Sequence, residues 1–169
     1  MKSGARAARK VIGGVDQPAS DGHATGLRQF NRSLPMALLR GHQAVMAEFR
    51  PILREHGITE QQWRVLRALD GGEPQRISQL SAATLISGPS LTRILRALEE
   101  ARLIRRTTEA DDQRAARISI QPAGRRLIAT VAPRSEERYT RIAERYGRRE
   151  LEALYDMLAR LPQALKRRS

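Results

Sequence analysis

The chain has 169 residues, no cysteine and a formal net charge of +13. Without cysteine it holds no disulfide, no thiolate redox sensor and no cysteine-ligated zinc, and a hydrophobic content of 40% excludes global disorder. The positive charge indicates a polyanionic partner, and because no run approaches ~18 consecutive apolar residues, a membrane-spanning helix is excluded.

Residues 1–32 are predicted to form a disordered basic arm, because glycines and basic residues recur there without apolar periodicity. Four cations would add electrostatic contacts to a polyanion, although a tail without a role fits the sequence equally well: Lys2, Arg6, Arg9 and Lys10. The arm lacks the apolar segment of a secretory signal, so we expect a cytoplasmic protein with no membrane partner.

Residues 33–57 are expected to form one long helix that is begun by Pro35. Pro51 removes one internal hydrogen bond and should kink this helix. The apolar face of this helix is so wide that the core of one domain cannot cover all of it. A capping box at Thr59 then opens a second helix, with Trp63 turned inward.

The next segment predicts two short helices joined by a turn, the helix-turn-helix arrangement. Ser78 would cap the first helix over residues 79–84. After a turn at Leu85, Ser87 would cap a second helix that runs to about Arg102. Its apolar residues recur at helical spacing and are expected to pack inward: Leu91, Ile94, Leu95 and Leu98.

The outward face of this second helix begins with short polar groups and continues with arginines. Short side chains let the backbone approach closely, so the face fits a DNA major groove. The residues expected to contact DNA are Ser87, Gly88, Pro89, Ser90, Thr92, Arg93 and Arg96. Arg93 would either read guanine through a bidentate fork or clamp a phosphate, and the sequence leaves both open.

A β-hairpin is predicted directly after this helix, with strands at 103–108 and 114–120 and a polar turn at 109–113. Basic residues near its tip make it a wing, and Arg117 lies on the polar face of its second strand. An isolated basic hairpin is as readily a solvated surface element. Its position next to a recognition-type helix favours a role in binding DNA.

Residues 122–165 are expected to form two further helices, the first interrupted by Pro133 and the second running from Arg148 to about Leu161. Together with 33–57 they enclose too little interior of their own, which indicates a partner chain. A two-fold homodimer would place two recognition helices ~34 Å apart, matching an inverted-repeat operator in double-stranded DNA.

The segments QLSAATLIS, GPSLTRILRALEEARLIRR and DDQR, in this order of elements, resemble the MarR family of winged-helix transcription factors. The resemblance covers residues 33–165. It implies a mainly α fold with a small β-wing, in which 58–121 form a winged helix-turn-helix lobe and 33–57 and 122–165 form long dimerisation helices.

The family's wing signature, an Asp, any residue and an Arg, is met by Asp112, Gln113 and Arg114. The resemblance implies that Arg114 reaches into a minor groove while Asp112 holds it in position. Two departures lie outside the DNA-contacting positions. In the first, Ala101 and Arg102 replace the usual Gly after the recognition helix. In the second, Gln121 stands where a Thr normally caps the next helix, and Pro122 at the first helical position partly offsets the loss of that cap.

Small aromatic acids commonly bind members of this family where the dimerisation helices meet the winged lobe. The segments SLPMALLR and ITEQQWRVLRAL most resemble the homoprotocatechuate-type subgroup of the family, which controls operons for aromatic-acid breakdown. The resemblance implies an effector pocket walled by Met36, Leu39, Arg40, His42, Gln43 and Trp63. There Arg40 would pair with a carboxylate, Trp63 would stack on a ring and His42 would hydrogen-bond a phenol. The sequence equally allows Trp63 as a core aromatic and Arg40 as an ion-pair partner.

No catalytic constellation, metal site or cofactor site is expected. The chain has no Gly-x-Ser-x-Gly elbow and no phosphate-cradling glycine loop, and His42 and His56 would stand ~21 Å apart on one helix. We therefore expect no enzyme but a dimeric repressor of an aromatic-acid catabolic operon, released from a palindromic operator by a small aromatic carboxylate. The alternative is a constitutive architectural protein of the nucleoid without an effector, which the positive charge suits as well.

Overall fold

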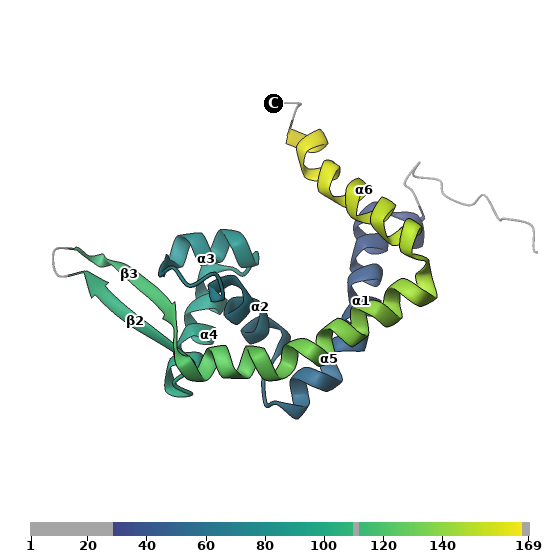
Figure 1. Ribbon diagram of the computed structural model, residues 1–169. Coiled ribbons are helices and arrows are strands. Elements are labelled where there is room, and N and C mark those ends of the chain that lie inside the picture. The colour runs from purple at the N-terminus through teal and green to yellow at the C-terminus, as the bar shows by residue number, and fades with distance from the viewer. Residues whose placement is uncertain (1–28, 110–111, 167–169) are drawn as a thin grey trace, which may run out of the picture. The chain divides into compact units, whose positions relative to one another are not determined.

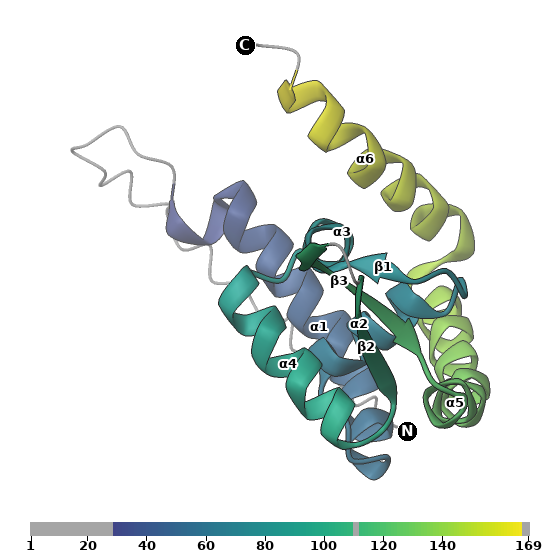
Figure 2. The same cartoon turned by 90° about the vertical axis from the view of Figure 1, so that its left-hand side faces the viewer.

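The computed structural model describes residues 29–109 and 112–166, without the side chains of residues 31, 108–109 and 112–115. The chain is mainly helical (Figure 1) with a small three-stranded antiparallel sheet (Figure 2), which confirms the predicted fold class. The elements are η1 (Phe30–Arg32), α1 (Leu34–Glu55), α2 (Glu60–Leu69), β1 (Gln75–Arg76), α3 (Ile77–Thr84), α4 (Gly88–Glu100), β2 (Ile104–Glu109), β3 (Asp112–Ile120), α5 (Pro122–Tyr146) and α6 (Arg148–Lys166).

The predicted arm has a different C-terminal boundary in the structure. Residues 1–28 of it lie outside the described part of the chain, but Phe30–Arg32 form a 3-10 turn, which the Ser33 hydroxyl caps by donating to the Phe30 carbonyl at 2.9 Å. The chain divides into two units after Leu38, within α1, and all later elements belong to the unit that starts at Leu39.

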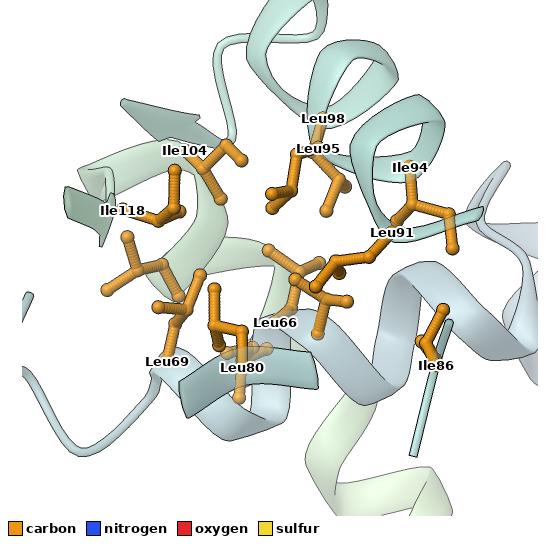
Figure 3. Packing of buried hydrophobic residues seen from close by; sticks show 13 residues of the cluster. Leu66, Leu69, Leu80, Ile86, Leu91, Ile94, Leu95, Leu98, Ile104 and Ile118 are labelled. Atoms are coloured by element: carbon orange, nitrogen blue, oxygen red, sulfur yellow. The ribbon is translucent and has the colours of Figure 1, made fainter. Parts of the chain in front are cut away.

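The hydrophobic core of the winged lobe forms where α2, α3, α4 and the sheet pack together (Figure 3). The apolar stripe predicted for α4 is buried, with Leu91, Leu95 and Leu98 at its centre. Ile104 of β2 and Ile118 of β3 close the cluster from the sheet. Full burial of each such side chain contributes ~1.5–3 kcal/mol, so this cluster fixes which face of α4 remains outside.

A second, smaller core joins α1 to α5 through Ile52, Leu53, Ile58 and Val131. Trp63 of α2 packs against this cluster and against the core of the winged lobe. The indole therefore lies at the junction between the lobe and the long helices, and a change in the packing around it affects both hydrophobic cores.

The sheet contains one strand more than the sequence predicted, in the order β1-β3-β2. In β1, Gln75 pairs with Ile118 and Arg76 with Arg117. Because this pairing holds the chain extended up to Arg76, α3 starts at Ile77 and Ser78 is not its cap, so that prediction was wrong. The capping box at Thr59 is confirmed, with its hydroxyl accepting from the Gln62 amide at 3.2 Å.

The long helices tolerate their prolines better than the sequence suggested. α5 continues through Pro133 without interruption, because the buried residues Val131 and Ser135 anchor it on both sides and only one hydrogen bond is lost. α6 passes Pro162 and ends at Lys166 rather than near Leu161. Within the described ranges, no helix combines the length and apolar character needed to cross a bilayer.

Candidate nucleic-acid interface and ligand pocket

The turn between α3 and α4 is held by two side-chain contacts. Arg64 of α2 donates to the Thr84 carbonyl at 3.2 Å, and the Ser81 hydroxyl donates to the Ile86 carbonyl at 2.8 Å. Arg64 is itself paired with Glu60 at 2.9 Å. The start of α4 is thereby fixed to α2 and α3 rather than left to its own cap, since Ser87 occupies the N-cap position without a side-chain cap bond.

The first turn of α4 presents the small residues that the sequence placed on the DNA face. Ser87, Gly88 and Pro89 are exposed, whereas Ser90 is half-buried. The Thr92 hydroxyl is exposed and donates back to the Gly88 carbonyl at 3.0 Å, which leaves its lone pairs outward. This end of the helix therefore lets another surface approach its backbone closely.

Two arginines follow on the exposed face of α4. Arg93 is exposed one turn into the helix, and Arg96 pairs with Glu100 at 2.9 Å, with both side chains largely in solvent. An exposed ion pair of this kind is worth only ~0–1 kcal/mol. The Arg96 guanidinium can therefore leave Glu100 and pair with a phosphate at little cost in free energy.

The wing is the β2–β3 hairpin, which extends beyond the helices in Figure 1. Strand pairing extends to Glu109 and Asp112, so β2 and β3 continue beyond the predicted strand ends at 108 and 114. The side chains of Asp112 and Arg114 lie outside the described residues, and their roles stay predictions. Arg117 is half-buried in the central strand between Arg76 and Thr107, away from the tip.

Sequence reasoning missed three exposed cations around this surface. They are Arg76, Arg105 and Arg106, which lie on the sheet beside Arg117 or at the base of the wing. The signal was present, because two successive basic residues in a short strand must point one to each face. The exposed basic surface is therefore broader than the predicted set of residues.

A pocket of about 140 Å³ opens between α1, α2 and α5. Its walls are mostly apolar or aromatic with a few polar groups: Val45, Met46, Phe49, Trp63, Arg67, Ala132, Ser135, Glu136 and Tyr139. Dry cavities of ~150 Å³ accept a benzene ring, so the volume suits a ligand with one aromatic ring. The pocket lies at the junction that Trp63 bridges.

The polar groups of the pocket differ in what they bind. The Arg67 guanidinium lies 5.9 Å from the Trp63 ring centroid, a cation held over an aromatic face. Its ion pair with Asp70 is long at 3.7 Å, so the guanidinium can turn to a ligand anion. Burial raises the pKa of the Tyr139 phenol, helped by Tyr155 and Glu136, so this hydroxyl stays protonated near neutral pH and can donate a hydrogen bond.

Of the residues predicted to wall an effector pocket, Trp63 alone lines this one. The others lie earlier on α1, where His42 is 3.3 Å from Glu60 and Gln43 accepts a hydrogen bond from Arg50. Leu39 and Arg40 are exposed, and Met36 precedes the boundary at Leu39. The cation that meets Trp63 here is Arg67, four residues further along α2 and therefore on the same helix face.

Comparison with known proteins agrees with this architecture. A sequence profile of the MarR family matches residues 56–115, from the end of α1 into the wing. The chain is 36% identical over 129 residues to the HTH-type transcriptional regulator FarR of Neisseria gonorrhoeae, covering 76% of this chain and 88% of that protein. It is 35% identical over 126 residues to the homoprotocatechuate degradative operon repressor of Escherichia coli, covering 75% and 85%.

Solved structures give the same result. The crystal structure of NadR in complex with 4-hydroxyphenylacetate matches this fold with a TM-score of 0.68 and 35% sequence identity, covering 80% of this chain and 96% of that one. The likeness to the homoprotocatechuate repressor also confirms the subgroup resemblance seen in the sequence. The chain therefore belongs to the MarR family of DNA-binding transcriptional regulators.

Proposed function

We propose that this protein is a homodimeric repressor of an operon for aromatic-acid breakdown, and that a hydroxylated aromatic carboxylate releases it from an inverted-repeat operator. The observation that carries the proposal is the position of the pocket. Trp63 and Arg67 line it from α2. The same helix holds the end of α3 through Arg64 and shares one hydrophobic core with α4. A ligand that moves α2 therefore also moves the recognition helix.

The chemistry of the pocket selects the ligand class. A carboxylate would pair with Arg67, the ring would lie against Trp63 and Phe49, and a ring hydroxyl would donate to Glu136, which also lines the pocket. Glu136 would repel an acid that had no hydroxyl at that end. Two relatives support this class by their names, one a homoprotocatechuate operon repressor and the other a structure with 4-hydroxyphenylacetate.

The dimer is supported by apolar surface that the chain does not cover itself. α6 has no buried residue, although its apolar positions form one stripe. Large apolar side chains exposed on α1, α5 and α6 include Leu38, Leu39, Val45, Tyr146, Tyr155, Met157, Leu158 and Leu165. A second copy would bury these faces and set the distance between the two α4 helices at about one DNA turn, ~34 Å.

Release requires that the ligand bind more tightly to a dimer whose two α4 helices stand at a distance that does not match successive major grooves. A tenfold preference at each site is worth ~1.4 kcal/mol, so two occupied sites weaken operator binding about a hundredfold. An operator selected from random duplexes, followed by a gel-mobility titration with 4-hydroxyphenylacetate, tests the whole proposal. Uniform affinity for all duplexes, unchanged by such acids, would instead support an architectural protein.

Replacing Arg93 by alanine is expected to cost ~1–3 kcal/mol of operator affinity and to flatten discrimination between operator and random DNA. The reason is its exposed position one turn into α4, within reach of base edges. Competition binding with both duplexes measures it. If the two duplexes weaken equally, Arg93 contacts only a phosphate.

Replacing Arg114 by alanine is expected to reduce operator affinity at least tenfold while the protein still folds and dimerises. Its position next to the closed tip of the β2–β3 hairpin places it on the wing, where it would enter a minor groove. Asp112→Ala should have a milder effect, because it releases the arginine rather than deleting it. Normal affinity of the Arg114 variant, measured by fluorescence anisotropy, would contradict the wing contact.

A further inference from the structure

Leu85 in the turn between α3 and α4 has a conformation and an exposure that its residue type does not favour. Its φ of 55° and ψ of 33° place it in the left-handed region, where glycine or asparagine is preferred. Leu85 is 87% exposed, more than any other large apolar residue in the described part of the chain. Both features oppose stability, so the fold itself gives no reason for a leucine here.

The residues on both sides of Leu85 are fixed. Thr84 and Ile86 are buried, and their carbonyls accept the hydrogen bonds from Arg64 and Ser81. The turn is therefore held in one conformation, and that conformation directs an apolar side chain into solvent. Strain of this kind persists where the surrounding structure imposes it, and it is found at sites that contact a ligand.

The position of Leu85 identifies what it meets. It stands three residues before the first residue of α4, at the end where Ser87, Gly88 and Pro89 are exposed, and Arg93 lies in the same half of the helix. A basic surface with short side chains complements DNA rather than a second, equally basic copy of the chain. An exposed apolar side chain needs an apolar group to pack against, and the one that base edges present in the major groove is the C5 methyl of thymine.

We propose that Leu85 is a specificity-determining residue that packs against a thymine methyl group in the major groove, next to the bases reached by α4. This inference rests on the proposed function, because it requires that α4 enter the groove. It explains the leucine as a residue kept for DNA recognition in a turn that would be more stable with glycine.

The test uses the full-length protein with Leu85→Gly and Leu85→Asn, two residues that accept the left-handed conformation. Both variants are expected to unfold at the same temperature as the wild type or higher, yet to bind the operator more weakly. In the operator, each thymine is replaced in turn by deoxyuridine, which removes only the methyl group. At one position per half-site the wild type should lose about fourfold in affinity, the value of one buried methyl, and both variants should lose nothing.

Arg102→Gly is the matched control. Arg102 is also an exposed residue with a left-handed backbone, at φ 57°, but it follows the opposite end of α4. Relieving its strain should raise the unfolding temperature in the same way and leave the dependence on deoxyuridine as in the wild type.

The possible failures are distinguishable. If the wild type selects no sequence from random duplexes, the proposed function is wrong, and the thymine contact is wrong with it. If it selects an operator that both Leu85 variants bind with wild-type affinity, or with the same dependence on deoxyuridine, only the thymine contact is overturned.

Discussion

An Arg67→Ala variant is expected to bind its operator with wild-type affinity and to have lost release by hydroxylated aromatic acids. Arg67 lines the pocket over the Trp63 ring and lies on a different helix from the exposed face of α4. Removing it leaves the ligand carboxylate without its cation, and a hydrogen bond to a charged group is worth ~1.5–3 kcal/mol. Ligand affinity should therefore fall roughly 10- to 100-fold at each site.

Arg40→Ala is the matched control, because Arg40 is the cation that the sequence had placed in the pocket. Both variants are titrated with 4-hydroxyphenylacetate, by thermal shift without DNA and by gel mobility with the operator. Benzoate serves as the acid without a ring hydroxyl, which Glu136 should exclude. The pocket described here requires that Arg67→Ala lose both responses and that Arg40→Ala keep them. The opposite result would restore the pocket predicted on the first part of α1. A wild type that does not respond to 4-hydroxyphenylacetate, or that responds equally to benzoate, would contradict this ligand class.

The sequence predicted the winged lobe well because its signals are local. The stripe of Leu91, Ile94, Leu95 and Leu98 recurs at helical spacing and is buried as expected. The capping box at Thr59 needs only its own first turn to form. The strand β1 escaped prediction because two residues carry no periodicity, and its existence depends on the pairing of Gln75 with Ile118 far along the chain.

The pocket was harder to predict because it depends on where three helices meet. Trp63 was predicted to stack on a ligand ring, but the cation beside it was sought on α1, although Arg67 stands on the same face of α2. Ser135, Glu136 and Tyr139 come from α5, far from α2 in the sequence, and no local pattern marks them as pocket residues. Helix propensity likewise underestimated α5 and α6, whose prolines each cost only one hydrogen bond.

Replacing Gly124 by alanine is expected to destabilise the fold by ~3 kcal/mol or more, since overpacking by one methyl typically costs ~1–3 kcal/mol and little can yield here. Gly124 is buried in the first turn of α5, where an added Cβ would lie 2.4 Å from the Leu103 carbonyl oxygen and 2.8 Å from Cγ1 of Ile120. The carbonyl is backbone and cannot rotate away. It also accepts from the Gln121 amide at 2.9 Å, so moving α5 aside breaks the connection between this helix and the base of the wing.

Gly41→Ala provides the control, because nothing lies within 4 Å of a Cβ added at that exposed position of α1. There alanine should stabilise the helix by ~0.4–1 kcal/mol. Urea unfolding followed by circular dichroism measures both variants, at one protein concentration because a dimer gains stability with concentration. A Gly124 variant as stable as the wild type would mean that α5 does not approach Leu103 this closely, and that the position of the wing relative to α5 does not depend on this glycine.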